Sequence, residues 1–310
     1  MTQSNRTRPA TDSPEWLLDG REVRVSNLDK LFWPSLGLTK RELLAYYLDL
    51  SPEVLPYLHG RPLVLKAYPD GADGPYYFRQ DLPQYAPAWL RRYETQPVSR
   101  RRTKRMPIVE DRASLVWLAN QGAIELHPWL STVAAPERPD YVMFDLDVES
   151  VEYFSLALEA ASLLRAMLGR LDVQAFPKTS GGNGLHVLIP IATLYSFDET
   201  RAWVRAVAER LQQRHPQLVT TSSARQGREK KVLVDYAQNG FGKTTVAPYS
   251  VRPRPEATVS APLSWAEVEA GRVRPADFWI GSLRRRVEEH GDLFTPSRGL
   301  AQRLTPLRDP

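Results

Sequence analysis

The stretch YVMFDLDVES, residues 141–150, ends an apolar run with two aspartates placed two positions apart. The run predicts a buried β-strand, and in a strand the side chains of Asp145 and Asp147 point to the same face. Two neighbouring anions repel each other unless a cation lies between them. The pair therefore indicates either a solvated turn at the end of a strand or a cation site.

A third carboxylate favours the cation site. Asp235 ends a second apolar run, KVLVDY at residues 231–236. If the two strands are neighbours, the three carboxylates converge at one edge of the sheet, and burying them together requires divalent cations. The chain has no cysteine, and oxygen ligation favours Mg²⁺ or Mn²⁺. Two such ions form the arrangement that serves phosphoryl transfer.

The composition of the 310 residues is that of an ordinary globular protein, with 42% hydrophobic and 25% charged residues. There is no stretch of the length of a membrane span and no apolar core in the first residues, so we expect a cytoplasmic protein without a secretory signal. The 41 basic against 36 acidic residues give a net charge of +5, which permits nucleic acid as a partner without requiring it. Two basic clusters, at 99–105 and 283–286, are either solvated faces or DNA contacts.

The pattern of elements predicts a mixed α+β fold. Thr39 and Glu42 form a capping box that predicts a helix from residue 40. From residue 140 onward strands and helices alternate, and Ser196 with Glu199 predicts another capped helix. We expect a polar tail over residues 1–14, an N-terminal subdomain over 15–135, a catalytic core over 136–295 and a second tail over 296–310. The expected strands cover 141–147, 173–176, 185–191 and 231–236, and the expected helices of the core cover 154–169, 197 onward and, as the last one, 264–270.

A glycine-rich segment, KTSGGNGLHVLI at 178–189, has three glycines within four positions. Its backbone N–H groups and the hydroxyl of Ser180 suit a phosphate, and His186 opens the next strand. The alternative is a plain glycine-rich hairpin with a partly exposed histidine. Positive charge near Asp235 suits a triphosphate as well, although each residue taken alone is compatible with a polar surface loop; the residues concerned are Arg228, Gln238, Lys243 and Arg252.

Taken in order, Asp145-Leu-Asp147, the segment from Ser180 to His186, and Asp235 resemble the three catalytic motifs of the archaeo-eukaryotic primase superfamily. More narrowly, the chain resembles the polymerase domain of bacterial DNA ligase D, an end-joining enzyme, from about residue 15 to about residue 295. The phrases that carry this resemblance are NLDKLFWP, TKRELLAYY, GRPLVLKAYPDG, WLANQGAIELHPW and VAPYSVRPRP. The resemblance implies a primase-polymerase core of β-sheets flanked by helices, with a smaller N-terminal subdomain.

The implied activity is that of a metal-dependent, DNA-directed nucleotidyltransferase. It would add one or a few nucleotides, preferably ribonucleotides, at gaps and broken DNA ends with a 5′-phosphate in non-homologous end joining. Two divalent ions, Mn²⁺ or Mg²⁺, would be held by Asp145, Asp147 and Asp235. Contacts to the incoming nucleotide are expected from Ser180, His186, His127, Arg228, Gln238 and Arg252. Contacts to DNA are expected from Asn27, Lys30 and Lys40 at the 5′-phosphate, from Lys66, and from Tyr77 and Phe78, which would stack on a template base.

Local physics supports Lys40, because the first turn of a capped helix favours an anion. Tyr77 and Phe78 could equally be ordinary core residues. The chain departs from the family at Asn183, where lysine is usual, so that a triphosphate contact is weaker or moves to Lys178. Ala67 and Asp81 also replace residues that are commonly basic, which affects the expected tightness of DNA binding.

Without a ligase or nuclease module in the sequence, we expect a stand-alone polymerase or an excised domain, located with the nucleoid. It would need a separate ligase and the Ku end-binding protein as partners. One alternative is a stand-alone primase-polymerase that makes primers or fills short gaps. Another is a DNA-end-binding module whose catalysis has decayed, although the presence of all three acidic residues argues against it.

Overall fold

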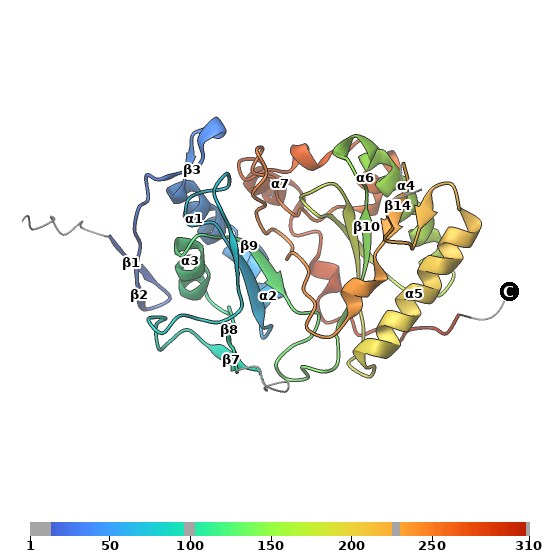
Figure 1. Ribbon diagram of the computed structural model, residues 1–310, viewed down its shortest axis with the longest axis horizontal. Coiled ribbons are helices and arrows are strands. Elements are labelled where there is room, and N and C mark those ends of the chain that lie inside the picture. Colours follow the sequence, from blue (N-terminus) through green and yellow to red (C-terminus); the bar gives the residue numbers. More distant parts are fainter. Residues whose placement is uncertain (1–13, 96–102, 225–229, 308–310) are drawn as a thin grey trace, which may run out of the picture.

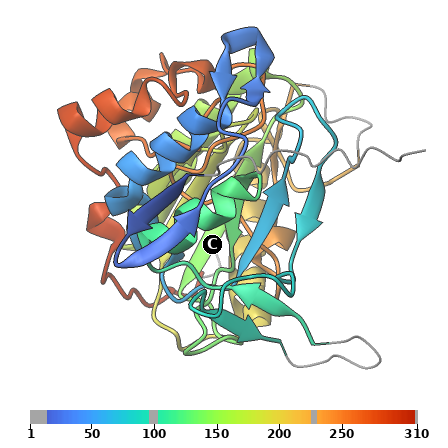
Figure 2. The same cartoon turned by 90° about the vertical axis from the view of Figure 1, so that its left-hand side faces the viewer.

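The computed structural model describes residues 14–95, 103–224 and 230–307, which form two halves lying side by side (Figure 1). The N-terminal half contains α1 to α3 and a small sheet, and the C-terminal half contains a larger sheet with α4 to α7. Figure 2 views the molecule from the N-terminal side, with the strands of the N-terminal half in front. The mixed α+β class expected from the sequence is confirmed.

The N-terminal half is built around an antiparallel sheet in the order β6-β5-β9, formed by Tyr77–Arg79, Leu63–Ala67 and Ala123–Pro128. Its helices are α1 (Lys40–Asp49), α2 (Ser51–Leu58) and α3 (Arg112–Asn120). The predicted capping box begins α1, since Thr39 accepts from the Arg41 N–H while Glu42 accepts from the Thr39 N–H. Three short hairpin-like pairs complete this half: β1 (Glu15–Leu18) with β2 (Arg21–Arg24), β3 (Leu31–Trp33) with β4 (Leu38–Thr39), and β7 (Arg92–Glu94) with β8 (Arg105–Pro107).

The C-terminal half is built around a five-stranded sheet in the order β11-β12-β10-β14-β13. The strands are β10 (Tyr141–Asp147), β11 (Phe176–Thr179), β12 (Leu185–Pro190), β13 (Val219–Thr220) and β14 (Val232–Val234), and only the pair β13–β14 is parallel. The helices are α4 (Phe154–Gly169), α5 (Phe197–Arg214), α6 (Trp265–Ala270) and α7 (Leu283–His290). Short 3₁₀ turns lie at Pro34–Leu36, Val151–Tyr153, Tyr236–Asn239, Pro275–Asp277 and Thr295–Ser297.

The central strand β10 separates the core from the site by its alternation. Phe144 is fully buried and packs edge-on against Trp203 of α5, with ring centroids 6.1 Å apart. Met143, Asp145 and Asp147 occupy the alternate positions and line a cavity. The strand therefore carries apolar side chains toward the helices and two carboxylates toward the cavity, as its sequence predicts.

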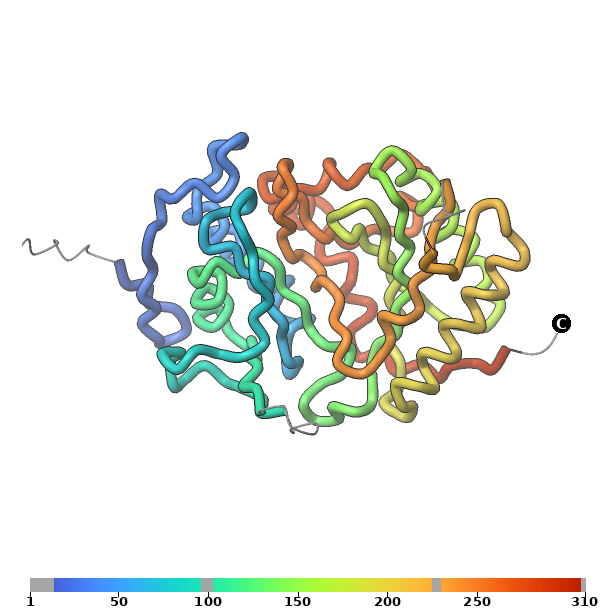
Figure 3. Tube along the Cα trace, viewed as in Figure 1, coloured from blue at the N-terminus to red at the C-terminus, as the bar shows by residue number. Residues whose placement is uncertain are grey.

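The two halves share one continuous apolar core. The segment around residues 245–260 returns from the C-terminal half and runs between the halves (Figure 3). Tyr46 of α1 donates to the Tyr249 carbonyl at 2.8 Å, and Trp33 donates to the Arg254 carbonyl at 3.0 Å. These hydrogen bonds join residues before position 135 to residues after it. The division into an N-terminal subdomain over 15–135 and a catalytic core over 136–295 remains a proposal.

Three expectations differ from the structure. The strand expected at 173–176 begins at Phe176 instead, and α6 is not the last helix, because α7 contains the basic cluster at 283–286. The segment after residue 295 is not a free tail over its described part. Gln302 accepts from the Gln174 N–H at 2.7 Å and donates to the Pro190 carbonyl at 3.1 Å, so it contacts the backbone just before β11 and at the end of β12. Residues 1–13 and 308–310 lie outside the described residues.

No helix in the described part of the chain is both long and apolar enough to cross a membrane.

Candidate active site

The three aspartates of the expected cation site lie together. The strands β10 and β14 are antiparallel neighbours, with Leu146 opposite Val234, and the Asp235 N–H donates to the Asp145 carbonyl at 2.9 Å. Antiparallel strands end at opposite edges of a sheet, so the expected convergence at one edge is not the reason for this proximity. The short β14 pairs only with the last residues of β10, and this register places Asp235 beside Asp145.

The surroundings of Asp145 disfavour its charged form. Burial first, and then the charges of Asp147 and Asp235, raise the pKa of Asp145 from 3.8 to about 7. The carboxylate of Asp235 accepts hydrogen bonds from the Ala237 N–H at 3.0 Å and from the Gln238 side chain at 2.9 Å. Gln238, expected to contact a nucleotide, thus holds Asp235 and lines the cavity at the same time.

Among the described residues, no three carboxylate or imidazole side chains stand at the mutual spacing of a metal-binding group. The donor chemistry nevertheless fits a divalent cation, because the charges of Asp147 and Asp235 act on Asp145 and, after burial, raise its pKa. Asp235 would have to turn from its contacts with Ala237 and Gln238 to join Asp145 and Asp147. The residues present therefore fit hard divalent cations such as Mn²⁺ or Mg²⁺.

The glycine-rich segment makes hydrogen bonds within its own loop. Ser180 Oγ accepts from the N–H groups of Gly182 and Gly184 at 3.1 and 3.2 Å. These two N–H groups are therefore not free for a phosphate, contrary to the expectation, and the hydroxyl of Ser180 is the group that remains to donate. Gly184 is required by close approach, since a Cβ at this position would overlap the Leu146 carbonyl oxygen. Asn183 donates to the Glu149 carbonyl at 3.2 Å, which ties the loop to the end of β10.

His186 lies between the carboxylates and the core. Its Nε2 is 3.4 Å from Asp145 Oδ1, and its Nδ1 is 2.9 Å from the ammonium of Lys178. Lys178 is fully buried and also donates to Ser260 Oγ at 2.6 Å. The suggestion that a triphosphate contact moves to Lys178 is therefore wrong, because this ammonium group points into the core.

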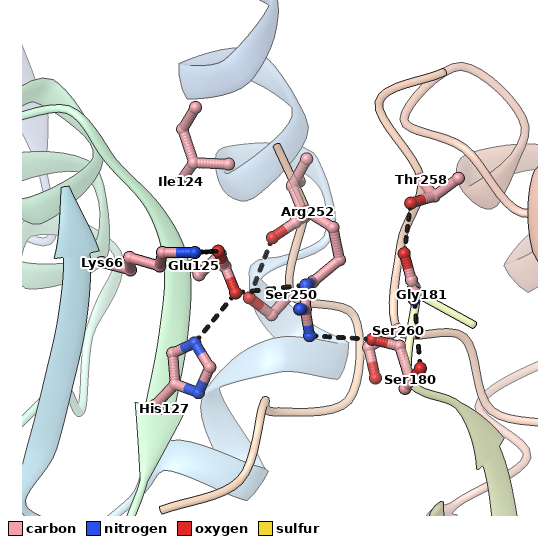
Figure 4. A network of polar contacts seen from close by, with 12 residues as sticks. Lys66, Ile124, Glu125, His127, Ser180, Gly181, Ser250, Arg252, Thr258 and Ser260 are labelled. Atoms are coloured by element: carbon pink, nitrogen blue, oxygen red, sulfur yellow. Dashed lines mark hydrogen bonds and ion pairs between the residues drawn. The ribbon is translucent and has the colours of Figure 1, made fainter. Parts of the chain in front are cut away.

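A second buried carboxylate organises the cationic side of the site (Figure 4). Glu125, with 1% of its side chain exposed, lies 3.1 Å from Lys66, 3.0 Å from His127 and 3.1 Å from Arg252, and accepts from the Tyr68 hydroxyl at 3.1 Å. Burial alone would raise its pKa, but the hydrogen bond from His127 and the charges of Arg252, His127 and Lys66 hold the pKa at about 2. Glu125 is therefore an anion that contacts three of the residues expected to bind DNA or the nucleotide.

Arg252 connects this network to the glycine-rich segment. One of its terminal nitrogens donates to the Ser180 carbonyl at 3.0 Å, while its Nε lies against Glu125. The guanidinium group thus spans from β9 of the N-terminal half to the loop that precedes β12. Arg228, expected to act beside it, lies outside the described residues.

The cavity between the two groups has a volume of about 660 Å³. The expected site residues that line it are His127, Asp145, Asp147, Ser180, His186, Gln238 and Arg252, together with Asn183. Lys66 lines an adjoining cavity of about 350 Å³ that shares Arg252 and Arg254 with the first. A nucleoside triphosphate has a size and charge that suit such a space, which is anionic at one end and cationic at the other.

Two residues of the site were missed in the sequence. Glu125 stands two positions before His127 on β9, so the i, i+2 rule that singled out Asp145 and Asp147 applies to it as well. Arg254 repeats the i, i+2 spacing after Arg252, and its guanidinium group lies close to Gly182.

The three residues expected at a 5′-phosphate lie around the start of α1. Lys40 is almost completely buried and its ammonium donates to the Ser26 carbonyl at 2.8 Å. Burial, and then the charge of Lys30, lower the pKa of Lys40 to about 8. Lys30 pairs with Asp70 at 2.6 Å, and Asn27, with φ of 53°, begins the turn in which the Lys30 N–H donates to the Asn27 carbonyl at 3.1 Å.

The helix start itself is less available than expected. The N–H of Lys40 donates to the Lys30 carbonyl at 2.8 Å, and the N–H of Arg41 donates to the Leu28 carbonyl at 2.9 Å. An anion there would therefore be held by side chains more than by the free N–H groups of α1.

The aromatic pair of β6 is on the surface. Tyr77 and Phe78 are 41% and 60% exposed, so the alternative that they are ordinary core residues is wrong. Phe78 meets the neighbouring Tyr76 edge-on, with centroids 5.9 Å apart. Exposed rings at the edge of a sheet are suited to stacking on unpaired bases.

The basic cluster at 283–286 is neutralised within the protein. Its arginines pair with carboxylates on α1, on α6 and within α7 itself: Arg284 with Asp49 and Glu288, Arg285 with Glu289, and Arg286 with Glu267. This arrangement favours a solvated helix face over a DNA contact. Most of the other cluster, at 99–105, lies outside the described residues.

Comparison with known proteins agrees with this geometry. The family model described as the LigD primase-polymerase domain matches residues 39–294. The chain is 35% identical over 291 residues to a "Multifunctional non-homologous end joining protein LigD" of Mycolicibacterium smegmatis, covering 92% of this chain and 38% of that one. It is 31% identical over 274 residues to a "Bifunctional non-homologous end joining protein LigD" of Bacillus subtilis, covering 88% of this chain and 44% of the relative. The chain thus spans about two fifths of the length of these relatives.

Among solved structures, the chain is similar to the polymerase domain of Mycobacterium tuberculosis ligase D, determined in complex with DNA. The two share 33% sequence identity and superpose with a TM-score of 0.84, over 90% of this chain and 99% of that one.

Proposed function

This chain belongs to the LigD primase-polymerase family, and on that premise we propose that it is a nucleotidyltransferase that adds one or a few nucleotides at gaps and broken DNA ends. The observation that supports this most is the single cavity of about 660 Å³, where Asp145 and Asp147 face His127, Ser180 and Arg252. The carboxylates of Asp145 and Asp147 suit the cations that phosphoryl transfer requires. The hydroxyl of Ser180 and the guanidinium group of Arg252 suit the oxygens of a triphosphate.

We assign the chemistry to the residues of this cavity. Two divalent ions, Mn²⁺ or Mg²⁺, held by Asp145, Asp147 and Asp235 would supply Lewis acidity at the primer 3′-hydroxyl and at the triphosphate. The hydroxyl of Ser180 and the guanidinium group of Arg252 bind phosphate oxygens.

Positioning is the other contribution of the chain. Glu125 holds Arg252 and His127 toward the same space, so that the cationic end of the cavity is formed before a nucleotide enters. Asn183 supplies no charge at the loop, whereas Arg254 lines the cavity and its guanidinium group lies close to the neighbouring Gly182.

The N-terminal half supplies the grip on DNA in this proposal. Asn27, Lys30 and Lys40 bind the 5′-phosphate across a gap, where the buried Lys40 would exchange the Ser26 carbonyl for an anion. Tyr77 and Phe78 stack on a template base. Residues 15–135 thus serve as a DNA-holding subdomain, and residues 136–295 serve as the catalytic core.

The proposal extends to the reaction context. The relatives are named for non-homologous end joining, and the similar solved structure contains DNA. We propose that this chain acts on chromosomal DNA ends together with a Ku protein and a ligase activity, and that it prefers ribonucleotides and Mn²⁺.

Primer extension on a gapped duplex tests the function. The duplex carries a 5′-phosphate at the downstream strand, Mn²⁺ is present, and ribo- and deoxynucleotides are compared. We expect one or a few ribonucleotides to be added by the wild type and none by Asp145→Ala/Asp147→Ala. Efficient dinucleotide synthesis on single-stranded template without a primer would favour a primase. Tight gap binding by a folded wild type that adds no nucleotide would leave an end-binding module.

A further inference from the structure

A stretch of chain between the two halves starts out as an additional strand along β9. The N–H of Thr245 donates to the Pro128 carbonyl at 3.3 Å, and the N–H of Ala247 donates to the Leu126 carbonyl at 2.9 Å. Continuing this antiparallel register would pair the next donor, two residues after Ala247, with the Ile124 carbonyl.

The added strand stops at Tyr249. This residue has φ of 64°, a left-handed conformation that bulky side chains rarely adopt. Its N–H donates to the Ser260 carbonyl at 2.8 Å instead of to β9. The chain therefore turns away from β9 at this point, and the Ile124 carbonyl and the Leu126 N–H are left without a strand partner on this side.

Two hydroxyl groups take the place of the missing strand. The Tyr47 hydroxyl donates to the Ile124 carbonyl at 2.7 Å and accepts from the Val251 N–H at 3.1 Å. The hydroxyl oxygen of Ser250 accepts from the Leu126 N–H at 2.9 Å. Both side chains are fully buried, and burial raises the pKa of Tyr47 above its usual value, so the phenol keeps its proton and is donor and acceptor at once.

These hydroxyls hold the residues on either side of Glu125 and the residues directly before Arg252. The ion pair between Glu125 and Arg252, at 3.1 Å, does not fix the guanidinium group by itself (Figure 4). One terminal nitrogen donates to the Ser180 carbonyl, but the buried Nε has no hydrogen-bond partner among the described residues. The position of the guanidinium group against Glu125 therefore depends on the backbone that the two hydroxyls hold.

We infer that the hydroxyls of Tyr47 and Ser250 are positioning groups that set Arg252 against Glu125 and thereby hold its guanidinium group toward the nucleotide cavity. The nucleotide part of this inference rests on the proposed function, whereas the placement of Arg252 does not. Tyr47 and Ser250 do not line the cavity, so they act on a nucleotide through Arg252 and not by contact.

The effect on the nucleotide is measured as the Kd of a triphosphate with a methylene bridge between its α- and β-phosphates, in Mn²⁺. We expect Tyr47→Phe to raise this Kd about tenfold and Ser250→Ala about threefold, because each leaves buried backbone groups unpaired and lets Arg252 shift. Tyr141→Phe is the matched control, since its hydroxyl lies 3.3 Å from Ser297 Oγ outside the cavity, and its Kd should equal that of the wild type. An unchanged Kd in Tyr47→Phe or Ser250→Ala would overturn the inference, and Ser250→Ala decides if Tyr47→Phe does not fold.

Primer extension and a double-mutant cycle separate positioning from a general structural effect. A shift of Arg252 weakens the hold on the triphosphate, so Tyr47→Phe should raise the nucleotide KM while kcat at saturating nucleotide stays within about twofold of the wild type. If Tyr47 acts through Arg252, adding Tyr47→Phe to Arg252→Met should cause no further rise in Kd. A kcat that falls as far as KM rises, or fully additive effects on Kd, would contradict the positioning role.

The placement of Arg252 is measured without a nucleotide by ¹⁵N NMR, as the rate at which its Nε proton exchanges with water; Arg252→Met assigns the signal. Because Nε is buried beside Glu125, we expect slow exchange in the wild type and in Tyr141→Phe, and faster exchange in Tyr47→Phe and Ser250→Ala. Equal exchange rates in the wild type and the two hydroxyl variants would overturn the inference. A wild type that binds no nucleotide would refute the proposed function, and the exchange rates would then decide the placement of Arg252 alone.

Discussion

Replacing Asp145 by asparagine should stabilise the metal-free protein at pH 8 while abolishing nucleotide addition. The carboxylate of Asp145 has 21% of its side chain exposed and lies beside Asp147 and Asp235. Burial, and then these two charges, raise its pKa from 3.8 to about 7. Asparagine keeps the size and shape of the side chain and removes the charge, so it relieves the repulsion and removes a proposed cation ligand together.

The size and sign of the effect follow from proton linkage. The folded protein holds this proton more tightly than the unfolded chain does, so the protonated group adds stability at low pH that is lost as the pH rises through about 7. Each pH unit between the two pKa values corresponds to about 1.4 kcal/mol, which gives about 4 kcal/mol at pH 8. Because part of the side chain reaches water, we expect Asp145→Asn to be more stable than the wild type by about 2–4 kcal/mol at pH 8 and by nearly zero at pH 4.

Urea unfolding with a chelator present measures this difference at both pH values. Asp198→Asn is the matched control for the replacement of an aspartate by asparagine, because 86% of the Asp198 side chain is exposed. Addition of Mn²⁺ at pH 8 should then stabilise the wild type more than Asp145→Asn. An asparagine variant that is less stable than the wild type at pH 8, or a difference that does not grow with pH, would refute the reasoning.

Three further tests concern other parts of the site. Glu125→Gln should lower the free energy of unfolding by about 2–3 kcal/mol, because it removes the anion that the partly buried Lys66 and Arg252 contact, and should raise the nucleotide KM about tenfold in steady-state assays. An unchanged KM would contradict the positioning role of Glu125. The wild type should bind a 5′-phosphorylated gap more tightly than an unphosphorylated one, and Lys30→Ala/Lys40→Ala should bind both equally, with a salt slope lower by about one per lost contact in anisotropy titrations. Gly184→Ala should lower primer extension about 100-fold by displacing β10, whereas Gly169→Ala, where a Cβ meets no atom within 4 Å, should keep activity and raise stability by about 0.5–1 kcal/mol.

Local signals in the sequence predicted much of this molecule. The capping boxes at Thr39 and Ser196 mark helix starts because the contacts that make them lie within four residues. The alternation in β10 identified the face of Asp145 and Asp147 for the same reason. The helix α7 was missed because three consecutive arginines hide the apolar positions that pack it, of which Leu283 is the buried one.

Contacts between distant residues could not be predicted in this way. Whether Asp235 reaches Asp145 depends on the antiparallel register of β14 against β10, which no spacing within either strand encodes. The burial of Lys40 and Lys178 likewise depends on segments far away in the chain. A lysine in a sequence motif is by default expected at the surface, and only packing shows that these two are not there.

The buried carboxylate of Glu125 and the partly buried carboxylate of Asp145 line two adjoining cavities and show opposite pKa shifts. Burial opposes ionisation in both, yet the pKa of Glu125 is held at about 2 while that of Asp145 rises to about 7. The difference lies in their neighbours, since three basic side chains surround Glu125 and two further carboxylates adjoin Asp145. The protein's own cations balance the charge of Glu125, which suits a positioning task. The charge of Asp145 is not balanced in this way, which suits a cation that arrives with the substrate. This contrast is the physical reason to place cations at Asp145 and the anionic nucleotide toward Arg252.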